Sequence, residues 1–341
     1  MKWEADLFQE IKTTEEVLPP TGGTPPALKP FDKDGRLVQP VWRRKDYLTD
    51  TWCHFNLARA SRPFIAPQLA SAEEGSCYFC PGSERFTPRD LETGADTLTA
   101  GQAQWKMRAF PNLYPWLIRH GNVVESPQHK VSLHDIDEEE ELAAFSAIRT
   151  LCANFEADSL YPVIFRNQGF GASTPHTHWQ SGALPYLPKR LKHELTTANM
   201  FARKWNKNIF DAIADAERRK GERFVSEDEL TICIVPYAPR SNYEVWLILK
   251  KPVSSLSSAG EAEIASMAAL MTKLLRALYQ KLNIDSLCVM CHQIPRENNY
   301  RLHLEVLPYK HWAGAERGFE EYVVEVTPEQ AASFLRKHLN Q

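Results

Sequence analysis

The 341-residue sequence lacks the features that mark several large classes of protein. Its net charge is only −3, with 40 basic against 43 acidic residues, so it has no basic excess of the kind that nucleic-acid binding requires. No apolar run approaches the length of a membrane span. The start, MKWEADLFQEI, resembles a short amphipathic helix and not a secretory signal. The seven cysteines are scattered, which favours thiols or metal ligands over disulfides. We therefore expect a cytoplasmic protein that binds neither nucleic acid nor membrane.

Proline and glycine are concentrated in residues 17–40, which predicts an extended arm and not a packed element. Beyond the arm, two stretches of chain have the same order of elements: two strand-like runs, a long helical run, and two further strand-like runs. In the first stretch these runs are 104–112, 122–128, 135–158 (helical), 161–167 and 177–186. In the second they are 229–239, 243–252, 257–282 (helical), 286–294 and 300–309. The acidic run Asp137–Glu141 suits a helix N-terminus, and we predict that it is solvated helix surface.

The common order indicates an internal duplication. ALPY at 183–186 and VLPY at 306–309 are 123 residues apart, as are Leu133 and Leu256. At that offset Asn299 and Arg301 would stand where the first copy has His176 and His178, so the chemistry would belong to the first copy only. We predict three parts: an N-terminal arm (1–42), a first unit with the functional residues (43–190), and a second, degenerate unit (191–341).

The segment GASTPHTHWQ (171–180) is the most informative stretch. His176 and His178 are two residues apart, so on a strand their side chains face the same side. They could be satisfied sheet residues, or they could serve one ligand or two adjacent tasks. The preceding turn, which includes Gly169, Gly171 and Ser173, allows backbone N–H groups to approach an anion. A histidine beside a bound phosphate can attack phosphorus and form a covalent intermediate.

Gln180 lies on the same face as the two histidines. Its amide can donate to a phosphate oxygen but cannot act as a general acid. A histidine at this position would suit hydrolysis, because it could protonate a leaving group. A glutamine suits a stable nucleotidyl-histidine that awaits a second acceptor.

GASTPHTHWQ resembles the active-site segment of the histidine-triad superfamily, in its nucleotidyltransferase branch, which contains galactose-1-phosphate uridylyltransferase, ADP-glucose phosphorylase and diadenosine tetraphosphate phosphorylase. The resemblance implies an α+β fold of two tandem, pseudo-symmetric histidine-triad-like units, each an antiparallel sheet with a long helix. It makes His178 the nucleophile. The phosphate contacts that it implies are Ser173, Gln180, Asn167 and the turn at Gly171.

Two further segments carry the resemblance. RASRP (59–63) resembles the branch's Arg-Ala-x-Arg-Pro motif, so Arg59 and Arg62 are expected to bind phosphates, for which paired guanidinium contacts are well suited. WKMRAFPNLYPWL (105–117) resembles the strand that lines the nucleotide base, which implies that Phe110, Asn112 and Leu113 lie near the base. Neither segment distinguishes uridine from adenine or identifies the acceptor.

Cys77 and Cys80 have the CxxC spacing of zinc knuckles and of redox motifs. In the branch that this chain resembles, the remaining zinc ligands come from SPxHxxxL and from the first histidine of the pair. Here these are His129 and His176. The resemblance therefore implies a closed, structural Zn²⁺ site, with His176 as a ligand and His178 left for chemistry.

His303 resembles one ligand of a second metal site found in some uridylyltransferases, but Glu305 stands where a histidine is typical. We predict that His292 and His303 are sheet residues or acceptor-site contacts. The predicted function is transfer of a nucleoside monophosphate from a nucleotide sugar or a dinucleoside polyphosphate to phosphate or a sugar-1-phosphate, through a covalent nucleotidyl-histidine. A homodimer is common in the branch. The alternatives are a nucleotide hydrolase and a non-catalytic, zinc-stabilised nucleotide-binding module.

Overall fold

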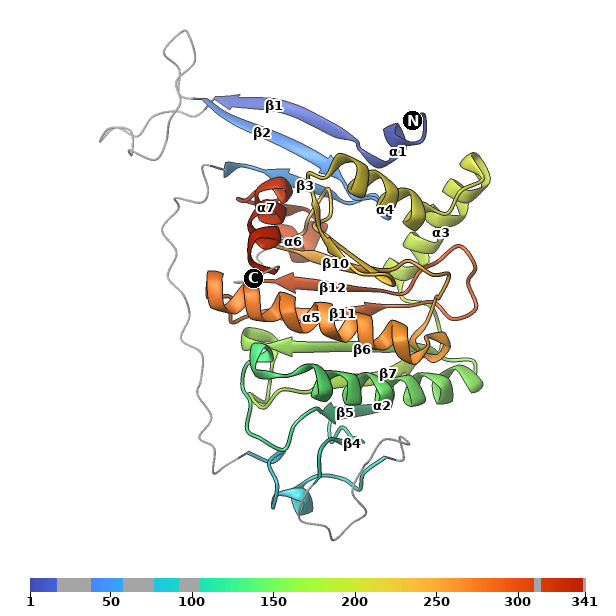
Figure 1. The fold of residues 1–341 in the computed structure, drawn as a ribbon, viewed down its shortest axis with the longest axis vertical. Helices are drawn as coiled ribbons and strands as arrows, with labels where there is room; N and C mark the ends of the chain where they lie inside the picture. Colours follow the sequence, from blue (N-terminus) through green and yellow to red (C-terminus); the bar gives the residue numbers. More distant parts are fainter. Residues whose placement is uncertain (17–37, 58–76, 92–104, 310–313, 340–341) are drawn as a thin grey trace, which may run out of the picture.

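The computed structural model describes residues 1–16, 38–57, 77–91, 105–309 and 314–339, and its centre is an antiparallel sheet of nine strands (Figure 1). The strand order is β4-β5-β7-β6-β11-β12-β10-β9-β8. The strands are β4 (Arg108–Pro111), β5 (Ile118–Val124), β6 (Tyr161–Gln168), β7 (Trp179–Leu184), β8 (Phe224–Glu227), β9 (Thr231–Ile234), β10 (Val245–Leu249), β11 (Leu287–His292) and β12 (His303–Pro308). Each of the eight predicted strand-like runs overlaps one of these strands, although the run 122–128 shares only its first three residues with β5, and β8 was not predicted. The two predicted sheets are one sheet, joined where β6 pairs with β11.

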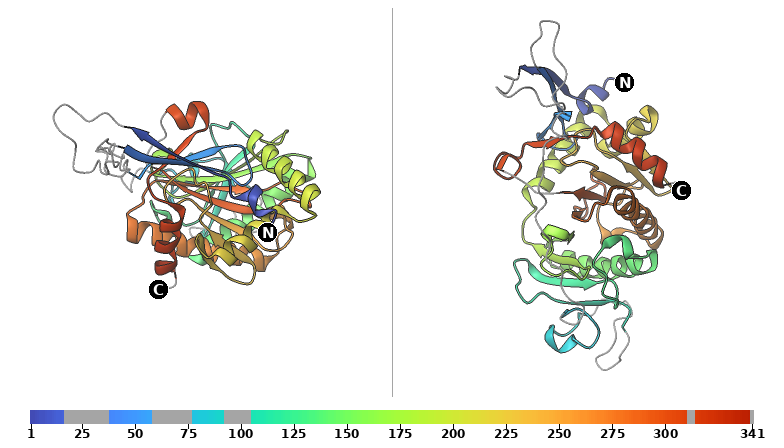
Figure 2. Two further views of the ribbon diagram at one scale, coloured as in Figure 1. Left: turned by 90° about the horizontal axis from the view of Figure 1, so that it is seen from above. Right: turned by 90° about the vertical axis from the view of Figure 1, so that its left-hand side faces the viewer.

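Two long helices lie side by side on one face of the sheet, α2 (Glu138–Ala157) and α5 (Glu261–Leu282) (Figure 1). Both were predicted from their helical periodicity. Asp137 caps α2 in a capping box with Glu140, which satisfies backbone N–H groups of the first turn. The main hydrophobic core fills the space between these helices and the sheet, and α7 (Pro328–Leu339) closes the same layer (Figure 2).

The opposite face of the sheet is covered differently in its two halves. Over the second half lie α3 (Lys189–Trp205) and α4 (Ile209–Lys220), which form a second core with side chains of β9 and β10. Over the first half lies the short segment 77–91, which contains CxxC, and its Phe79 packs with Phe110. The first half therefore has no helical cover on this face within the described residues.

A separate four-stranded sheet has the order β1-β2-β3-β13. Its strands are β1 (Glu10–Glu16), β2 (Val38–Lys45), β3 (Trp52–Phe55) and β13 (Tyr322–Val324), and α6 (Gly314–Phe319) precedes the last of them. The predicted N-terminal helix is only α1 (Glu4–Leu7), which buries Trp3 and Leu7 against α4 residues. The predicted arm (1–42) thus includes a hairpin strand and part of β2, while residues 17–37 lie outside the described residues. The division into three parts stays a proposal.

The internal duplication is real in the fold, but its offset changes along the chain. The helices α2 and α5 begin 123 residues apart, as predicted. In the hairpins that follow, Pro162 pairs with Ala183 and Leu287 pairs with Pro308, so the offset there is 125. The cause is that α5 has 22 residues and α2 has 20.

This change corrects the predicted correspondence of residues. His303, not Arg301, stands at the position of His178, and Glu305 stands at that of Gln180. The prediction that Asn299 and Arg301 replace the histidine pair is wrong, because the ALPY and VLPY match does not follow the register of the strands. The α+β class with two antiparallel hairpin-and-helix units is confirmed. Among the described residues, no helix combines the length and apolar character needed to cross a membrane.

Candidate active site and metal centre

His178 lies directly before β7 and is 5% exposed. Its Nδ1–H donates to the carbonyl oxygen of His176 at 2.9 Å, so Nε2 carries the lone pair that can attack. Burial lowers the pKa of His178 below its ordinary value, although the hydrogen bond to the His176 carbonyl acts in the opposite direction. The imidazole is therefore held neutral, in one tautomer, and in one orientation.

The turn that precedes the histidines packs against the second half of the chain. Gly169 has φ +73°, and a Cβ there would meet Ser286 Oγ at 2.1 Å. A Cβ on Gly171 would meet Tyr309 Oη at 2.2 Å and Asn167 Cγ at 3.2 Å. The structure thus brings Asn167 and Gly171 together, and their contact with phosphate stays a prediction. Ser173 follows in the same segment and is exposed to solvent.

The residues predicted to line the base differ in their surroundings. Phe110 is buried, and its ring meets the edge of Phe79 at 5.3 Å. Asn112 donates from Nδ2 to Asn122 Oδ1 at 3.2 Å. Leu113 is 61% exposed, so its side chain lies at the surface of the described residues. Arg59 and Arg62, the predicted phosphate-binding arginines, lie outside the described residues.

The four predicted metal ligands come together. One ligand atom from each of Cys77, Cys80, His129 and His176 lies within 4.8 Å of all the others. Cys80 Sγ is 3.2 Å from His129 Nδ1 and 3.6 Å from His176 Nδ1. His176 Nε2–H donates to Ser126 O at 3.0 Å, which leaves Nδ1 as an acceptor aimed at the thiols. Burial lowers the pKa of His176 to about 4, which keeps the ring in the neutral form that binds metal.

The segment Cys77–Cys80 also contacts His178, the candidate nucleophile. Phe79, between the two cysteines, meets the His178 ring edge-on at 5.2 Å. The segment Cys77–Cys80 and the candidate ligand His176 therefore both support His178, through Phe79 and through the His176 carbonyl.

Sequence analysis missed His120 on β5. Its Nε2 is 3.1 Å from Gln180 Oε1, and its Nδ1 is 3.4 Å from the backbone nitrogen of Trp116. His120 stands in the strand-like run IRHGNVV, which follows the segment predicted to line the nucleotide base. Nothing in the sequence indicates that this strand pairs with β7.

A buried ionic network lies on the other face of β7, and it was also missed. Arg166 donates from Nη1 to Glu125 at 3.0 Å and to Glu141 at 2.8 Å, and its guanidinium lies 4.4 Å from the Trp179 ring centroid. Trp179 Nε1–H donates to Glu141 at 3.1 Å. The prediction that the run Asp137–Glu141 is solvated is therefore wrong for Glu141, which is 1% exposed because it is at the end of the run that turns toward the sheet.

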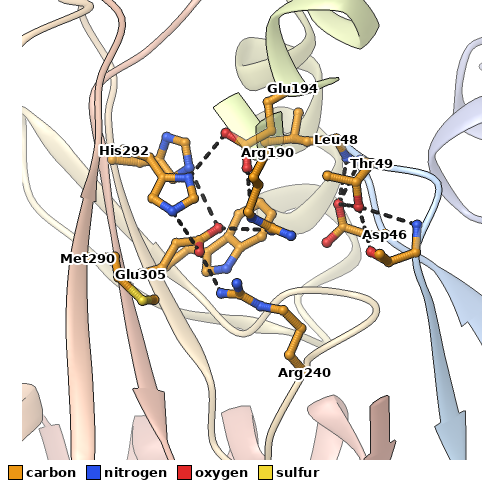
Figure 3. A network of polar contacts seen from close by, with 12 residues as sticks. Asp46, Leu48, Thr49, Arg190, Glu194, Arg240, Met290, His292 and Glu305 are labelled. Atoms are coloured by element: carbon orange, nitrogen blue, oxygen red, sulfur yellow. Dashed lines mark hydrogen bonds and ion pairs between the residues drawn. The ribbon is translucent and has the colours of Figure 1, made fainter. Parts of the chain in front are cut away.

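The counterpart of the active site in the second half is buried, and it contains the network of polar contacts drawn in Figure 3. His303 is fully buried, and its ring lies 5.3 Å from Phe210 of α4. His292 bridges two carboxylates, with Nδ1 3.1 Å from Glu194 and Nε2 3.1 Å from Glu305. Burial alone would lower the pKa of His292, but the charges of the two glutamates raise it above its ordinary value.

Two arginines complete this buried cluster: Arg190 lies 3.0 Å from Glu194, and Arg240 pairs with Glu305 and with Glu244. With His292 charged, three cations face three carboxylates. Glu194, His292 and His303 also have ligand atoms within 4.8 Å of one another, so these residues can hold a metal, although their charges are balanced without one.

The joined hairpin-and-helix units and the His-x-His-x-Gln segment resemble those of the histidine-triad nucleotidyltransferases. The chain is 27% identical to an ADP-glucose phosphorylase from Arabidopsis thaliana over 336 residues, which are 86% of this chain and 92% of that protein. It is 26% identical to a galactose-1-phosphate uridylyltransferase from Saccharomyces cerevisiae over 265 residues, 68% of this chain and 72% of that protein.

A crystal structure of an ADP-glucose phosphorylase from A. thaliana with bound ADP-glucose matches the fold with a TM-score of 0.72 at 25% identity. The match covers 87% of this chain and 99% of that one. No protein-family model matches the chain. The similarities confirm the resemblance to the histidine-triad nucleotidyltransferases, and with it the predicted class of enzyme.

Proposed function

We propose that this chain moves a nucleoside monophosphate from a nucleotide sugar to phosphate or to a sugar-1-phosphate, through a covalent intermediate on His178. The observation that carries the proposal is the His178 imidazole, whose Nδ1–H is held by the His176 carbonyl at 2.9 Å. Its Nε2 is thereby the attacking atom, and Gln180 lies two residues further along the same face.

In the first step, Nε2 of His178 attacks the α-phosphorus, a P–N bond forms, and the bond from that phosphorus to the bridging oxygen breaks. The sugar-1-phosphate leaves with the electron pair of the broken bond. The positive charge on the imidazole is stabilised by the carbonyl oxygen that accepts its Nδ1–H. In the second step, an oxygen of the acceptor attacks the same phosphorus and His178 leaves. No water is consumed, in keeping with an amide and not a third histidine at position 180.

We propose that the metal is zinc. Two thiolates and two imidazoles are the ligand set that zinc prefers, and four protein ligands close the coordination shell. Such an ion would hold the segment 77–80 against the strand and fix the carbonyl of His176. It would not take part in the transfer.

For the donor, we propose ADP-glucose or a related purine nucleotide sugar, with phosphate as acceptor. The support is the relative named ADP-glucose phosphorylase, 92% of which is matched by this chain. A uridine nucleotide sugar is the second candidate, because other relatives are named uridylyltransferases. We also propose a homodimer: Tyr114 and Trp116, between β4 and β5, are 87% and 62% exposed, as interface aromatics are before assembly.

The test is incubation with ADP-glucose labelled at the α-phosphorus, without acceptor. We expect one label per chain, release of glucose-1-phosphate, and recovery of the label as ADP when phosphate is added. His178→Asn should remain unlabelled. Release of AMP without an acceptor would favour the hydrolase, and nucleotide binding with neither label nor product would favour the binding module. The same assay with a labelled uridine nucleotide sugar decides the base.

A further inference from the structure

His120 is buried beside Gln180, and its two ring nitrogens have different partners. The residue is 3% exposed and projects from β5, the neighbour of β7 in the sheet. Nε2 is 3.1 Å from Gln180 Oε1, and Nδ1 is 3.4 Å from the backbone nitrogen of Trp116. The arrangement links a strand outside the His-x-His-x-Gln segment to the last residue of that segment.

The partner of Nδ1 determines the rest of the arrangement. A backbone N–H can only donate, so Nδ1 of His120 must be the acceptor. In a neutral imidazole the proton is then on Nε2, which must donate. The atom of Gln180 that receives this bond is therefore its carbonyl oxygen. It follows that the NH₂ arm of the Gln180 amide is turned away from His120.

We propose that His120 is a positioning residue: it fixes the Gln180 carboxamide so that the NH₂ group, and not the carbonyl oxygen, faces the phosphoryl group transferred to His178. The inference rests on the proposed function, because the phosphoryl group at His178 is the ligand that the amide would serve. His120 itself does not contact the transferred group.

The reason for such a device lies in the symmetry of the glutamine side chain. The terminal torsion of glutamine has two broad minima that exchange the oxygen and the NH₂ group. One of them offers a donor to the phosphoryl oxygens, and the other offers a lone pair that repels them. A fixed donor aimed at developing charge is worth much more than one that must reorient during the reaction.

The same contacts argue against His120 as a general acid. Both of its nitrogens are engaged, and burial lowers its pKa, so the ring is neutral at pH 7. Its Nε2–H is already donated to Gln180 Oε1. This proton is therefore not available to a leaving group.

The first experiment does not depend on activity. Two-bond ¹H–¹⁵N correlations of the ¹⁵N-histidine-labelled chain report the tautomer of each imidazole. We expect the His120 signal, assigned by its loss in His120→Phe, to show a protonated Nε2 and a bare Nδ1 at pH 7. A protonated Nδ1, or an imidazolium, would overturn the inference, since Gln180 would then be free to present either end.

The second experiment is a double-mutant cycle read by the rate of label transfer to His178 from α-labelled ADP-glucose. His120→Phe should lower the maximal rate about 10²-fold, with little change in KM, and Gln180→Ala should have a similar effect. Because His120 acts only through Gln180, the double variant should be no slower than Gln180→Ala. His120→Gln, whose amide nitrogen can replace Nε2 as the donor, should recover most of the rate. His193→Phe, a partly exposed histidine of α3 that pairs with Asp50, is the control and should leave the rate of label transfer unchanged.

The outcomes separate the inference from the proposed function. If the losses of the two single variants multiply in the double variant, His120 does not act through Gln180 and the inference is overturned alone. If the folded wild-type chain takes up label from neither an adenine nor a uridine nucleotide sugar, the proposed function is refuted. The proposed role of His120 is then refuted as well, because it rests on that function.

Discussion

His178 and His303 make the same backbone hydrogen bond, each from Nδ1–H to the carbonyl two residues earlier, and each at 2.9 Å. Each ring is also capped by a phenylalanine, Phe79 over His178 and Phe210 over His303. The two phenylalanines belong to different elements: Phe79 to the short segment Cys77–Cys80, and Phe210 to the helix α4. Helix α4 thus covers the His303 ring, whereas among the described residues no α-helix covers the His178 ring.

This difference predicts opposite effects for matched substitutions. His303→Asn should keep label transfer but lower the free energy of unfolding by about 1–3 kcal/mol, since a fully buried ring and its hydrogen bond are lost. His178→Asn should abolish transfer and retain more of the stability. Urea unfolding and labelling of both variants check the prediction. Loss of labelling in a folded His303→Asn chain would assign chemistry to the second half and contradict it.

The sequence was sufficient for the parts of the site that lie within one motif. His176, His178 and Gln180 share a strand face because of the two-residue period, and the tetrad around Cys77 was found through the resemblance. The role of His120 could not be predicted, because His120 contacts Gln180 across the paired strands β5 and β7, and no local sequence pattern indicates that pairing. Glu141 was misjudged for a related reason: its partner Arg166 is 25 residues away.

The fold, like the site, was predicted only in part from the sequence. Local sequence patterns located eight strands of the large sheet and the two long helices. It did not locate α3 and α4, which cover the second half, and it did not reveal the two extra residues of α5. Those two residues move His303 into the position of His178, a change that a fixed repeat offset cannot detect.

Removal of the metal ligands gives the next prediction. A Cys77→Ser/Cys80→Ser chain should contain no zinc, whereas the wild-type chain should contain about one equivalent by elemental analysis. The variant should also be less stable by several kcal/mol, because metal binding is coupled to folding. Cys233→Ala, a buried cysteine of β9, is the control and should retain the zinc. A stable wild-type chain without zinc would refute the tetrad.

The turn before the histidines can be tested at Gly171. In Gly171→Ala the new methyl group would meet Tyr309 Oη at 2.2 Å, so the tyrosine or the turn must move. We expect transfer to slow about tenfold and stability to fall by about 1–2 kcal/mol. Adding Tyr309→Phe removes the clashing oxygen and should recover part of both. Gly318→Ala, where a Cβ would meet nothing within 4 Å, should be neutral. An unaltered rate in Gly171→Ala would show that the turn does not position the phosphate.

Glu125 provides a prediction on pH. Burial raises its pKa from 4.5 to about 7, although Arg166 acts in the opposite direction. One arginine faces two buried carboxylates here, Glu125 and Glu141, so one carboxyl group can stay protonated without leaving Arg166 unpaired.

A carboxyl group with a raised pKa in the folded state makes its full contribution to stability at low pH, and the contribution is lost as the pH rises toward the folded pKa. Between pH 4.5 and 7 the wild-type chain should lose on the order of 3 kcal/mol through Glu125. Glu125→Gln cannot ionise, so it should be as stable as wild type near pH 5 and gain relative to it at pH 8. Glu139→Gln, an exposed position on α2, should follow the wild-type curve. Urea unfolding at both pH values measures the difference, and a gap between wild type and Glu125→Gln that is independent of pH would contradict the assigned protonation.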